Sequence, residues 1–189
     1  MSTVRKTKLS PQEYLTLERQ ALYKSEYYNG EVFAFAGASE PHNLIVSNVL
    51  TLFNLQLKTR SCKVYPSDMR IKISETGLYT YPDVTVVCGE AKVEDEHLDT
   101  LLNPTVIVEV LSPSTEKDDS ILKFAHYRRL PSLMEYILIA QDSVRLEQYV
   151  RQPDDRWLLS EYSDLGVTAR IPSIECELPM KDVYDKLKI

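Results

Sequence analysis

The sequence is poor in the residues that build common cofactor sites and covalent frameworks. Only five of its 189 residues are glycine, and none lies in a GxGxxG or GxxxxGK(S/T) pattern, which excludes the standard dinucleotide and P-loop sites. The three cysteines, Cys62, Cys88 and Cys176, are far apart and form no CxxC pair. We therefore expect neither a disulfide framework nor a thiolate zinc site. The three histidines likewise show no HExxH-like ligand spacing.

Long apolar runs are also missing. No run approaches the roughly 18 residues needed to cross a bilayer, and no apolar segment of a secretory signal follows the basic first residues. We therefore expect a cytoplasmic protein with no membrane partner. With 43% hydrophobic and 26% charged residues and a mean hydropathy of -0.26, the composition is that of a globular chain. The length predicts a single domain over residues 1–189, with a flexible tail at residues 1–9.

Positive charge is in the minority, because Asp and Glu outnumber Lys and Arg by 28 to 22 and the net charge is -6. This balance excludes a general nucleic-acid coat, but it does not exclude an enzyme acting on DNA, since local basic patches decide that contact. We expect modest and strongly salt-dependent affinity for nucleic acid. The candidate DNA contacts are Arg5, Lys6, Lys8, Lys58, Arg60, Lys63, Arg70, Lys72, Arg128 and Arg129.

The spacing of the apolar residues predicts an alternation of helices and strands. An S-x-x-E capping box predicts a short helix after Ser10, and apolar spacings of three and four predict a longer helix from His42 to about Lys58. The other expected elements are strands at 31–36, 69–73, 81–87, 105–111, 133–140, 145–150 and 157–162 and helices at 116–130 and 180–187. Together they predict an α/β or α+β sandwich, with the last two strands paired as a hairpin.

Two polar segments carry predictions about exposure. Arg70 and Lys72 alternate with apolar residues in the strand 69–73, which predicts one solvent-exposed face. The acidic stretch 90–99 predicts a surface loop or a short exposed helix.

Glu109 is the most informative residue. It lies in the apolar strand 105–111, on the same face as Ile107 and Leu111. A carboxylate in a buried strand costs several kcal/mol unless it is paired or holds a cation. From the residues alone, a structural ion pair and a functional site explain Glu109 equally well.

Asp83 is the second candidate. It follows Pro82, which begins a strand well because it lacks an N–H, and an ordinary turn-forming aspartate is the simpler explanation when Asp83 is considered alone. Two acids on neighbouring strands, however, form an oxygen-rich pocket. Such a pocket suits Mg²⁺, which needs one or two carboxylates plus waters and a phosphate.

At this point the sequence resembles the Uma2 family, also called DUF820. The motifs that carry the resemblance are Tyr81-Pro82-Asp83-Val84, Val108-Glu109-Val110-Leu111-Ser112-Pro113-Ser114-Thr115, Asp119-Ser120-Ile121-Leu122-Lys123 with Tyr127, and Glu135-Tyr136, with further matches at Asn29-Gly30-Glu31 and His42. The likeness runs from about Pro11 to Ile189. It implies the PD-(D/E)xK restriction-endonuclease-like fold, a mixed β-sheet flanked by helices, here with an additional C-terminal β-hairpin.

The resemblance also implies an activity and a set of roles. The protein would be a metal-dependent endonuclease that hydrolyses phosphodiester bonds in DNA. Asp83 and Glu109 would hold Mg²⁺, for which Mn²⁺ can substitute, and Glu31 would reach the same metal. The superfamily usually has a lysine two residues after the second carboxylate, where this chain has Leu111; in the Uma2 pattern the lysine lies on the following helix, and Lys123 matches it.

Two further residues are weaker candidates. His42 lines the site or binds a phosphate at the start of its helix, or it simply caps and packs there. Tyr127 follows Asp119 and Lys123 at spacings of four along one side of a helix. Without the resemblance, this trio is typical of a surface ion pair of little energetic value.

Two alternatives to an endonuclease stay open. One is a catalytically inactive nuclease-fold protein that acts as a DNA-binding or regulatory module. The other is a purely structural protein in which Asp83 and Glu109 pair with Arg70 or Lys72. A homodimer is expected for the enzyme, because cutting both strands of a duplex suits twofold symmetry.

Overall fold

The protein is described from a computed structural model, which describes residues 8–34, 37–112 and 119–189, with side chains from Leu122 onward in the third helix. Several predictions concern residues outside these ranges. They are the tail 1–7, the end of the strand 31–36, the Pro113-Ser114-Thr115 part of the third motif, and the side chain of Asp119.

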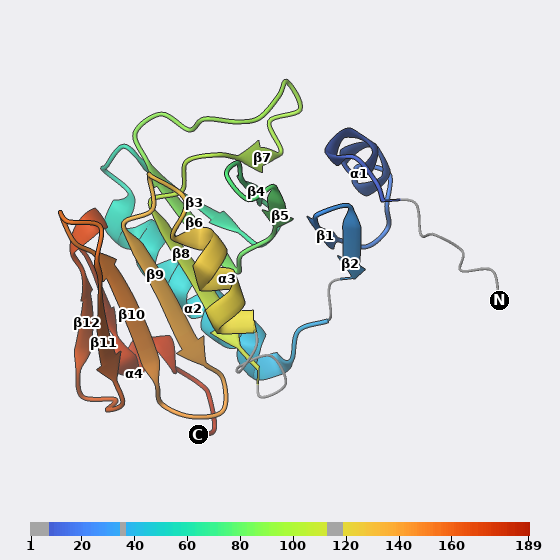
Figure 1. Cartoon of the computed structure of the whole chain (residues 1–189). Helices are drawn as coiled ribbons and strands as arrows, with labels where there is room; N and C mark the ends of the chain where they lie inside the picture. Colours follow the sequence, from blue (N-terminus) through green and yellow to red (C-terminus); the bar gives the residue numbers. More distant parts are fainter. Residues whose placement is uncertain (1–7, 35–36, 113–118) are drawn as a thin grey trace.

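The strands of the described residues form two mixed sheets and one small ribbon (Figure 1). The large sheet has six strands in the spatial order β11 (Trp157–Tyr162), β10 (Leu146–Arg151), β9 (Glu135–Ala140), β8 (Val106–Leu111), β6 (Val84–Cys88) and β3 (Cys62–Pro66). The small sheet has five, in the order β2 (Glu31–Ala34), β1 (Ser25–Tyr28), β5 (Leu78–Thr80), β4 (Arg70–Ile73) and β7 (Thr100–Leu101). The ribbon pairs β12 (Thr168–Ile171) with β13 (Cys176–Pro179).

Four α-helices complete the described part of the chain: α1 (Pro11–Glu18), α2 (Glu40–Leu57), α3 (Asp119–Tyr127) and α4 (Met180–Val183), with a 3₁₀ turn at Pro172–Ile174. The expected capping box begins α1, because the Ser10 side chain accepts from the Glu13 N–H while the Glu13 carboxylate accepts from the Ser10 N–H. The predicted long helix is confirmed as α2, and Ser39 caps it by accepting from the His42 N–H. Among the described residues, no helix is both long and apolar enough to span a membrane.

The large sheet is covered on both faces. On one face α2, α4 and the β12–β13 ribbon enclose a core that includes Val106, Val108 and Val110. On the other face lie α3 and the small sheet, and the core there includes Ile107 and Leu111. Figure 1 shows α2 behind the large sheet and α3 in front of it. The expected central strand, apolar on both faces, is therefore confirmed as β8, whose six residues are all buried.

Two hairpins agree with the sequence. The Asn29-Gly30 turn joins β1 to β2, and both residues have positive φ (50° and 86°), as the type I′ hairpin turn requires. The C-terminal hairpin is confirmed as β10–β11. The expected helix at 180–187 is shorter than predicted, since regular α-helix ends at Val183.

Only part of the segment 81–87, predicted as one strand, is a strand. Residues 81–83 form the crossing from β5 of the small sheet to β6 of the large sheet, and the strand begins at Val84. Pro82 cannot donate to a ladder, so the chain leaves one sheet here and enters the other. Asp83 is consequently the last residue of this crossing and lies at the border of the two sheets.

The predicted exposed face of the strand 69–73 is wrong. Arg70 is buried, with 2% of its surface exposed, and Lys72 is half-buried. The acidic stretch 90–99 explains this difference. It is a loop as expected, but it folds over β4 so that Asp99 pairs with Arg70 at 3.0 Å and Glu94 pairs with Lys72.

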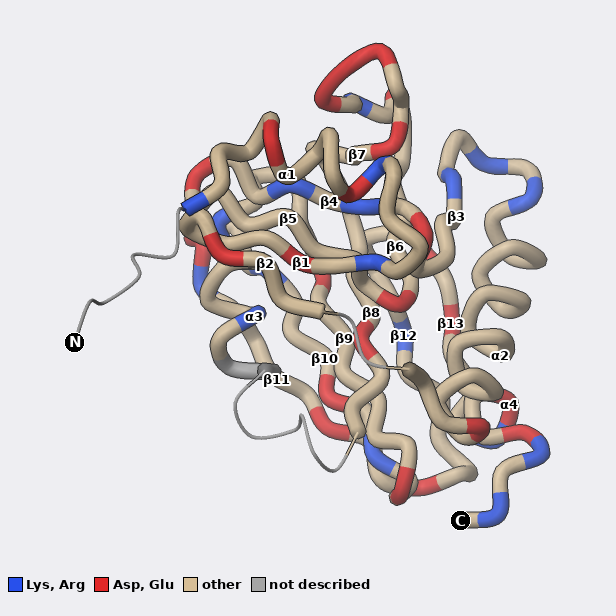
Figure 2. Tube along the Cα trace, turned by 90° about the vertical axis from the view of Figure 1, so that its right-hand side faces the viewer, with Lys and Arg blue, Asp and Glu red and all other residues tan. Residues whose placement is uncertain are grey.

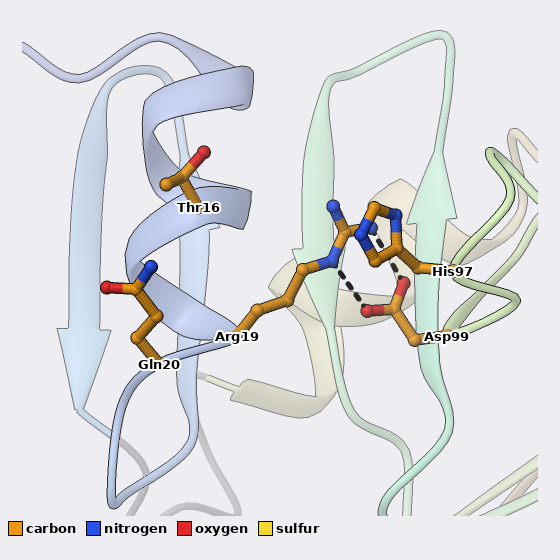
Figure 3. A pocket seen from close by; sticks show the side chains of 5 residues that line it. All are labelled: Thr16, Arg19, Gln20, His97 and Asp99. Carbon is orange, nitrogen blue, oxygen red and sulfur yellow. Dashed lines mark hydrogen bonds and ion pairs between the residues drawn. The ribbon is translucent and has the colours of Figure 1, made fainter.

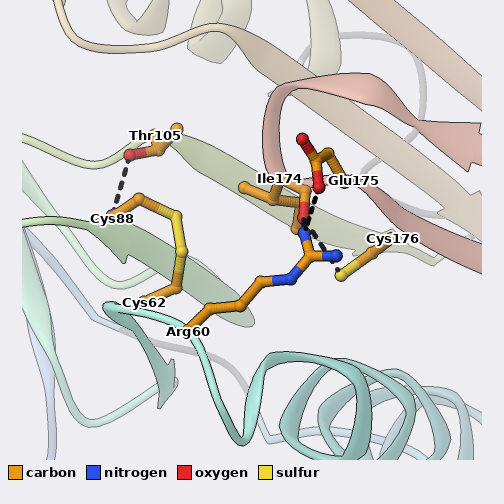
Figure 4. The surroundings of a disulfide bond; sticks show 7 residues. All are labelled: Arg60, Cys62, Cys88, Thr105, Ile174, Glu175 and Cys176. Atoms are coloured by element: carbon orange, nitrogen blue, oxygen red, sulfur yellow. Dashed lines mark hydrogen bonds and ion pairs between the residues drawn. A yellow bond between two sulfur atoms is a disulfide. The ribbon is translucent and has the colours of Figure 1, made fainter.

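The expectation that no disulfide forms is also wrong. Cys62 and Cys88 are bonded to each other, while Cys176 is free and buried (Figure 4). The two bonded residues begin β3 and end β6 and are direct partners in the antiparallel register. Their separation of 26 residues hides this proximity, because only strand pairing brings them together.

Candidate active site

The candidate site forms where β8, the β5–β6 crossing and α3 meet. Glu109 projects from β8 toward α3 and the small sheet, and only 7% of its surface is exposed. Tyr127 of α3 is fully buried and its hydroxyl donates to Glu109 Oε1 at 2.6 Å. A buried carboxylate requires such donors, and this bond fixes the direction of the Glu109 side chain.

Asp83 lies opposite Glu109. The β6–β8 register pairs Val84 with Val108 in antiparallel order, so continuing it by one residue places Asp83 across from Glu109 on the same face. Directly opposed residues of antiparallel strands have Cβ atoms about 5 Å apart. Asp83 is buried, with 6% exposed, and its Oδ2 accepts from the Val110 N–H at 2.7 Å.

The electrostatics of this pair are unfavourable without a cation. Burial raises the pKa of Glu109 to about 7, and the nearby carboxylates of Asp83 and Glu26 add to the rise, against the opposite effects of the Lys123 ammonium and the Tyr127 hydrogen bond. Burial and Glu109 also raise the pKa of Tyr127 well above its ordinary value. The site therefore concentrates negative charge in a nearly water-free position.

Lys123 provides positive charge at this position. Its Nζ lies 3.5 Å from Glu109 Oε1 and 3.3 Å from Glu26 Oε1, and its side chain is one-fifth exposed. Leu111, at the position where the superfamily usually has its lysine, is part of the apolar core. The structure thus brings three of the predicted residues, Glu109, Lys123 and Tyr127, into one contact group.

His42 reaches the same site from the first turn of α2. Its Nε2 lies 3.2 Å from Asp83 Oδ2. Burial lowers the pKa of His42, but the contact with Asp83, together with Glu109, outweighs it, so the pKa is raised. His42 therefore contacts one of the two candidate carboxylates from the start of α2.

Glu31, the third acid that the resemblance implied, belongs to the second strand of the N-terminal hairpin. It is exposed at the start of the edge strand β2, opposite Tyr28. Glu26 of β1 instead reaches Lys123, and the sequence reasoning missed it. The available signal was alternation in β1, since Tyr27 packs on Tyr14 and Tyr79 and so turns its neighbour Glu26 to the other face.

The structure excludes the ion pairs proposed for a purely structural role. Arg70 pairs with Asp99 and Lys72 with Glu94, whereas the partners of Asp83 and Glu109 are His42 and Lys123. Neither Arg70 nor Lys72 is therefore an open contact for DNA. Figure 2 shows Lys and Arg concentrated from the turn between α2 and β3 into the start of β3. Lys58 and Arg60 belong to the turn, and Lys63 belongs to β3.

A separate pocket lies away from the carboxylates, between α1 and the loop 90–99. Figure 3 shows its lining, which consists of Thr16, Arg19, Gln20, His97 and Asp99. The Arg19 guanidinium binds Asp99 at 2.8 Å and also Asp95 at 2.7 Å. These ion pairs neutralise the charge of Arg19 and hold α1 against the loop 90–99. We therefore interpret the pocket as part of the contact between α1 and this loop.

The donor set fits Mg²⁺ better than a metal held by protein ligands alone. Within 8–34, 37–112 and 119–189 no group of three or more His, Cys, Asp or Glu side chains is arranged to hold a metal ion. Mg²⁺ needs only one or two carboxylates and takes its other ligands from waters and a phosphate. A cation between Asp83 and Glu109 also offsets the repulsion by Asp83 that adds to the effect of burial on the pKa of Glu109.

The fold is a mixed α+β arrangement in which Asp83, Glu109 and Lys123 lie where β6, β8 and α3 meet. The family model Uma2, described as "Putative restriction endonuclease", matches residues 11–181. The chain belongs to the Uma2 family.

The chain is also similar to two relatives and to one solved structure. The chain is 43% identical over 172 residues to the "Uncharacterized protein sll1609" of Synechocystis sp. (90% of this chain, 96% of the relative). It is 39% identical over 155 residues to "Uncharacterized protein slr1290" of the same organism (82% and 80%). The fold is similar to the crystal structure of "a putative nuclease belonging to DUF820 from Anabaena variabilis ATCC 29413", with a TM-score of 0.76, 20% identity and coverage of 93% of this chain and 97% of that one.

Proposed function

We propose that the protein is a cytoplasmic endonuclease that hydrolyses phosphodiester bonds in DNA, with Mg²⁺ held by Asp83 and Glu109 and with Mn²⁺ able to replace it. One observation carries the proposal. Two buried carboxylates face each other across β6 and β8, and a lysine ammonium lies 3.5 Å from one of them. This combination of residues suits hydrolysis of a phosphate ester.

Each side chain has a role that follows from its contacts. When bound, a divalent ion polarises the phosphate and lowers the pKa of a water molecule. Asp83 is held for binding by the Val110 N–H and by His42. The Lys123 ammonium is available to orient the attacking water or to stabilise the negative charge that develops on the phosphate.

A cleavage assay tests the proposal. Supercoiled plasmid and single-stranded DNA are incubated with Mg²⁺ or Mn²⁺ and either the wild type or Glu109→Ala, whose folding is checked by circular dichroism. We expect the wild type to cleave and the folded variant to lose cleavage by more than about 1000-fold, because several kcal/mol of metal-dependent stabilisation are removed. Equal cleavage by the two proteins would contradict the assignment of Glu109.

The same preparations distinguish the inactive DNA-binding alternative and the homodimer. Salt-dependent DNA binding by the wild type, without cleavage under either metal, would favour a binding module on the nuclease fold. Sedimentation equilibrium measures whether the enzyme is the twofold dimer that double-strand cleavage suits.

A further inference from the structure

Glu26 belongs to no motif discussed above, yet it contacts the lysine of the site. Its Oε1 lies 3.3 Å from Lys123 Nζ, and its side chain is one-fifth exposed. The hydroxyl of Thr80, which is fully buried, donates to the same oxygen. Extending the pairing of Tyr27 with Tyr79 by one residue places Glu26 opposite Thr80, so the backbone itself holds this contact.

The position of Lys123 depends on two sheets at once. Glu109 belongs to β8 of the large sheet and Glu26 to β1 of the small sheet. The lysine ammonium lies between their carboxylates, at 3.5 Å and 3.3 Å. A lysine side chain is flexible and carries a compact charge, so a single contact leaves it free to move.

A second carboxylate can hold the lysine when a metal ion and the ammonium compete for Glu109. If the ammonium were held by Glu109 alone, a metal ion that takes the Glu109 oxygens would displace it by charge repulsion. A carboxylate that does not itself bind the metal keeps the lysine beside the site while Glu109 binds the metal. Glu26 is suitably placed, because its own hydroxyl partner Thr80 is on the small sheet.

We propose that Glu26 is a positioning residue that holds the Lys123 ammonium beside the carboxylates of Asp83 and Glu109. This role rests on the proposed nuclease function. The N-terminal hairpin thereby becomes part of the site: β1 supplies the acid that fixes the lysine of α3. Glu31 of the same hairpin, exposed on β2, is the matched control.

The contact between Glu26 and the Lys123 ammonium is tested without metal or DNA. In nitrogen-15 spectra of lysine ammonium groups at low temperature, a held ammonium exchanges slowly and gives a signal. We expect the Lys123 signal, identified by its loss in Lys123→Ala, in the wild type and in Glu31→Gln but not in Glu26→Gln. A wild type without the signal, or a Glu26→Gln variant that retains it, overturns the proposal.

The effect of Glu26 on cleavage through Lys123 is tested by a double-mutant cycle. We expect Glu26→Gln to slow single-turnover cleavage by roughly 10- to 100-fold, as misplacement of a catalytic group does, with Glu26→Asp intermediate. In the Lys123→Ala background the same change has no further effect on cleavage or on Mn²⁺ affinity measured by calorimetry. An equal loss of Mn²⁺ affinity in both backgrounds makes Glu26 a metal ligand and overturns a positioning role.

The two proposals fail in different ways. A wild type that shows the Glu26-dependent ammonium signal but neither binds Mn²⁺ nor cleaves DNA contradicts the nuclease function and, with it, the catalytic meaning of Glu26. A wild type that cleaves DNA as well after Glu26→Gln contradicts only the role of Glu26. Circular dichroism of each variant shows whether it has folded.

Discussion

Two buried glutamates on neighbouring strands of the large sheet differ in the groups that surround them: charged side chains surround one, and neutral hydrogen-bond donors the other. Glu109 of β8 faces the small sheet and α3, where Asp83, Glu26 and Lys123 surround it. Glu135 of β9 is completely buried, and its position beside Val106 at the start of the parallel β8–β9 pair puts it far from the site end. Its two oxygens accept from the Gln148 amide at 2.5 Å and the Ser173 N–H at 2.7 Å.

The comparison separates structural from functional burial of an acid. Glu135 is satisfied by neutral donors, one of which, Gln148, also links it to Arg170 by donating to that carbonyl. Glu109 faces other carboxylates, and burial raises its pKa to about 7. Such clusters are typical of positions that bind a cation or perform chemistry, which is the role we propose for Glu109.

Replacing each glutamate by glutamine is expected to give the largest difference between the two positions. Glu109→Gln is expected to reduce cleavage by more than about 1000-fold because it removes a metal-binding charge. Glu135→Gln places a second amide against the donors of Gln148 and Ser173, and we expect a loss of about 1–3 kcal/mol in the free energy of unfolding with less than tenfold change in cleavage. Denaturant unfolding and the plasmid assay measure the two effects. Equal loss of cleavage in two folded variants would remove the distinction.

The disulfide tests whether the site depends on the far end of β6, since Cys88 ends the strand that Asp83 precedes. Closing a loop across 26 residues stabilises a protein by about 3–4 kcal/mol in the chain-entropy model. We expect Cys62→Ser with Cys88→Ser to lower the free energy of unfolding by up to this amount, while Mn²⁺ affinity stays within about threefold of the wild type. Unfolding in urea and calorimetry provide the two values. Loss of metal binding by the folded variant would show that the disulfide sets the site geometry.

The two glutamates are also expected to differ in how they affect the pH dependence of stability. Between pH 4.5 and about 7 the folded metal-free protein keeps the Glu109 proton that the unfolded chain has lost, so its stability falls as pH rises. The raised pKa corresponds to roughly 3 kcal/mol at most, at about 1.4 kcal/mol per pKa unit. Glu109→Gln should remove most of this slope, and Glu135→Gln should retain it. Urea unfolding at several pH values measures the slope; an unchanged slope in Glu109→Gln contradicts the raised pKa.

Local sequence features predicted the elements on which the site is built. The capping box at Ser10, the helical period of α2, the Asn29-Gly30 turn and the apolar run of β8 are each determined by neighbours within a few residues. Glu109 stood out because a carboxylate interrupts that apolar run. Asp83 and Lys123 were assigned through the resemblance, and the structure places both of them beside Glu109.

The features that the sequence did not show all depend on long-range pairing. Arg70 appeared exposed because nothing nearby in sequence indicates that Asp99 covers it. The strands β3, β5, β7, β12 and β13 have two to five residues each, too few to establish a period. Glu26 was missed in favour of Glu31 because only the sheet order, with β1 between β2 and β5, shows which strand lies nearer the site.

The proposal that Asp83 and Glu109 hold a divalent metal ion is best tested by calorimetry of Mn²⁺ binding, because this measurement requires no knowledge of the DNA target. It is made at about pH 8, where Glu109 is ionised. The proteins compared are the wild type, Asp83→Asn and Glu135→Gln, each checked for folding by circular dichroism. We predict binding by the wild type and by Glu135→Gln and its loss in Asp83→Asn. A folded wild type that binds no Mn²⁺, either alone or with DNA present to supply phosphate ligands, would contradict the carboxylate metal site.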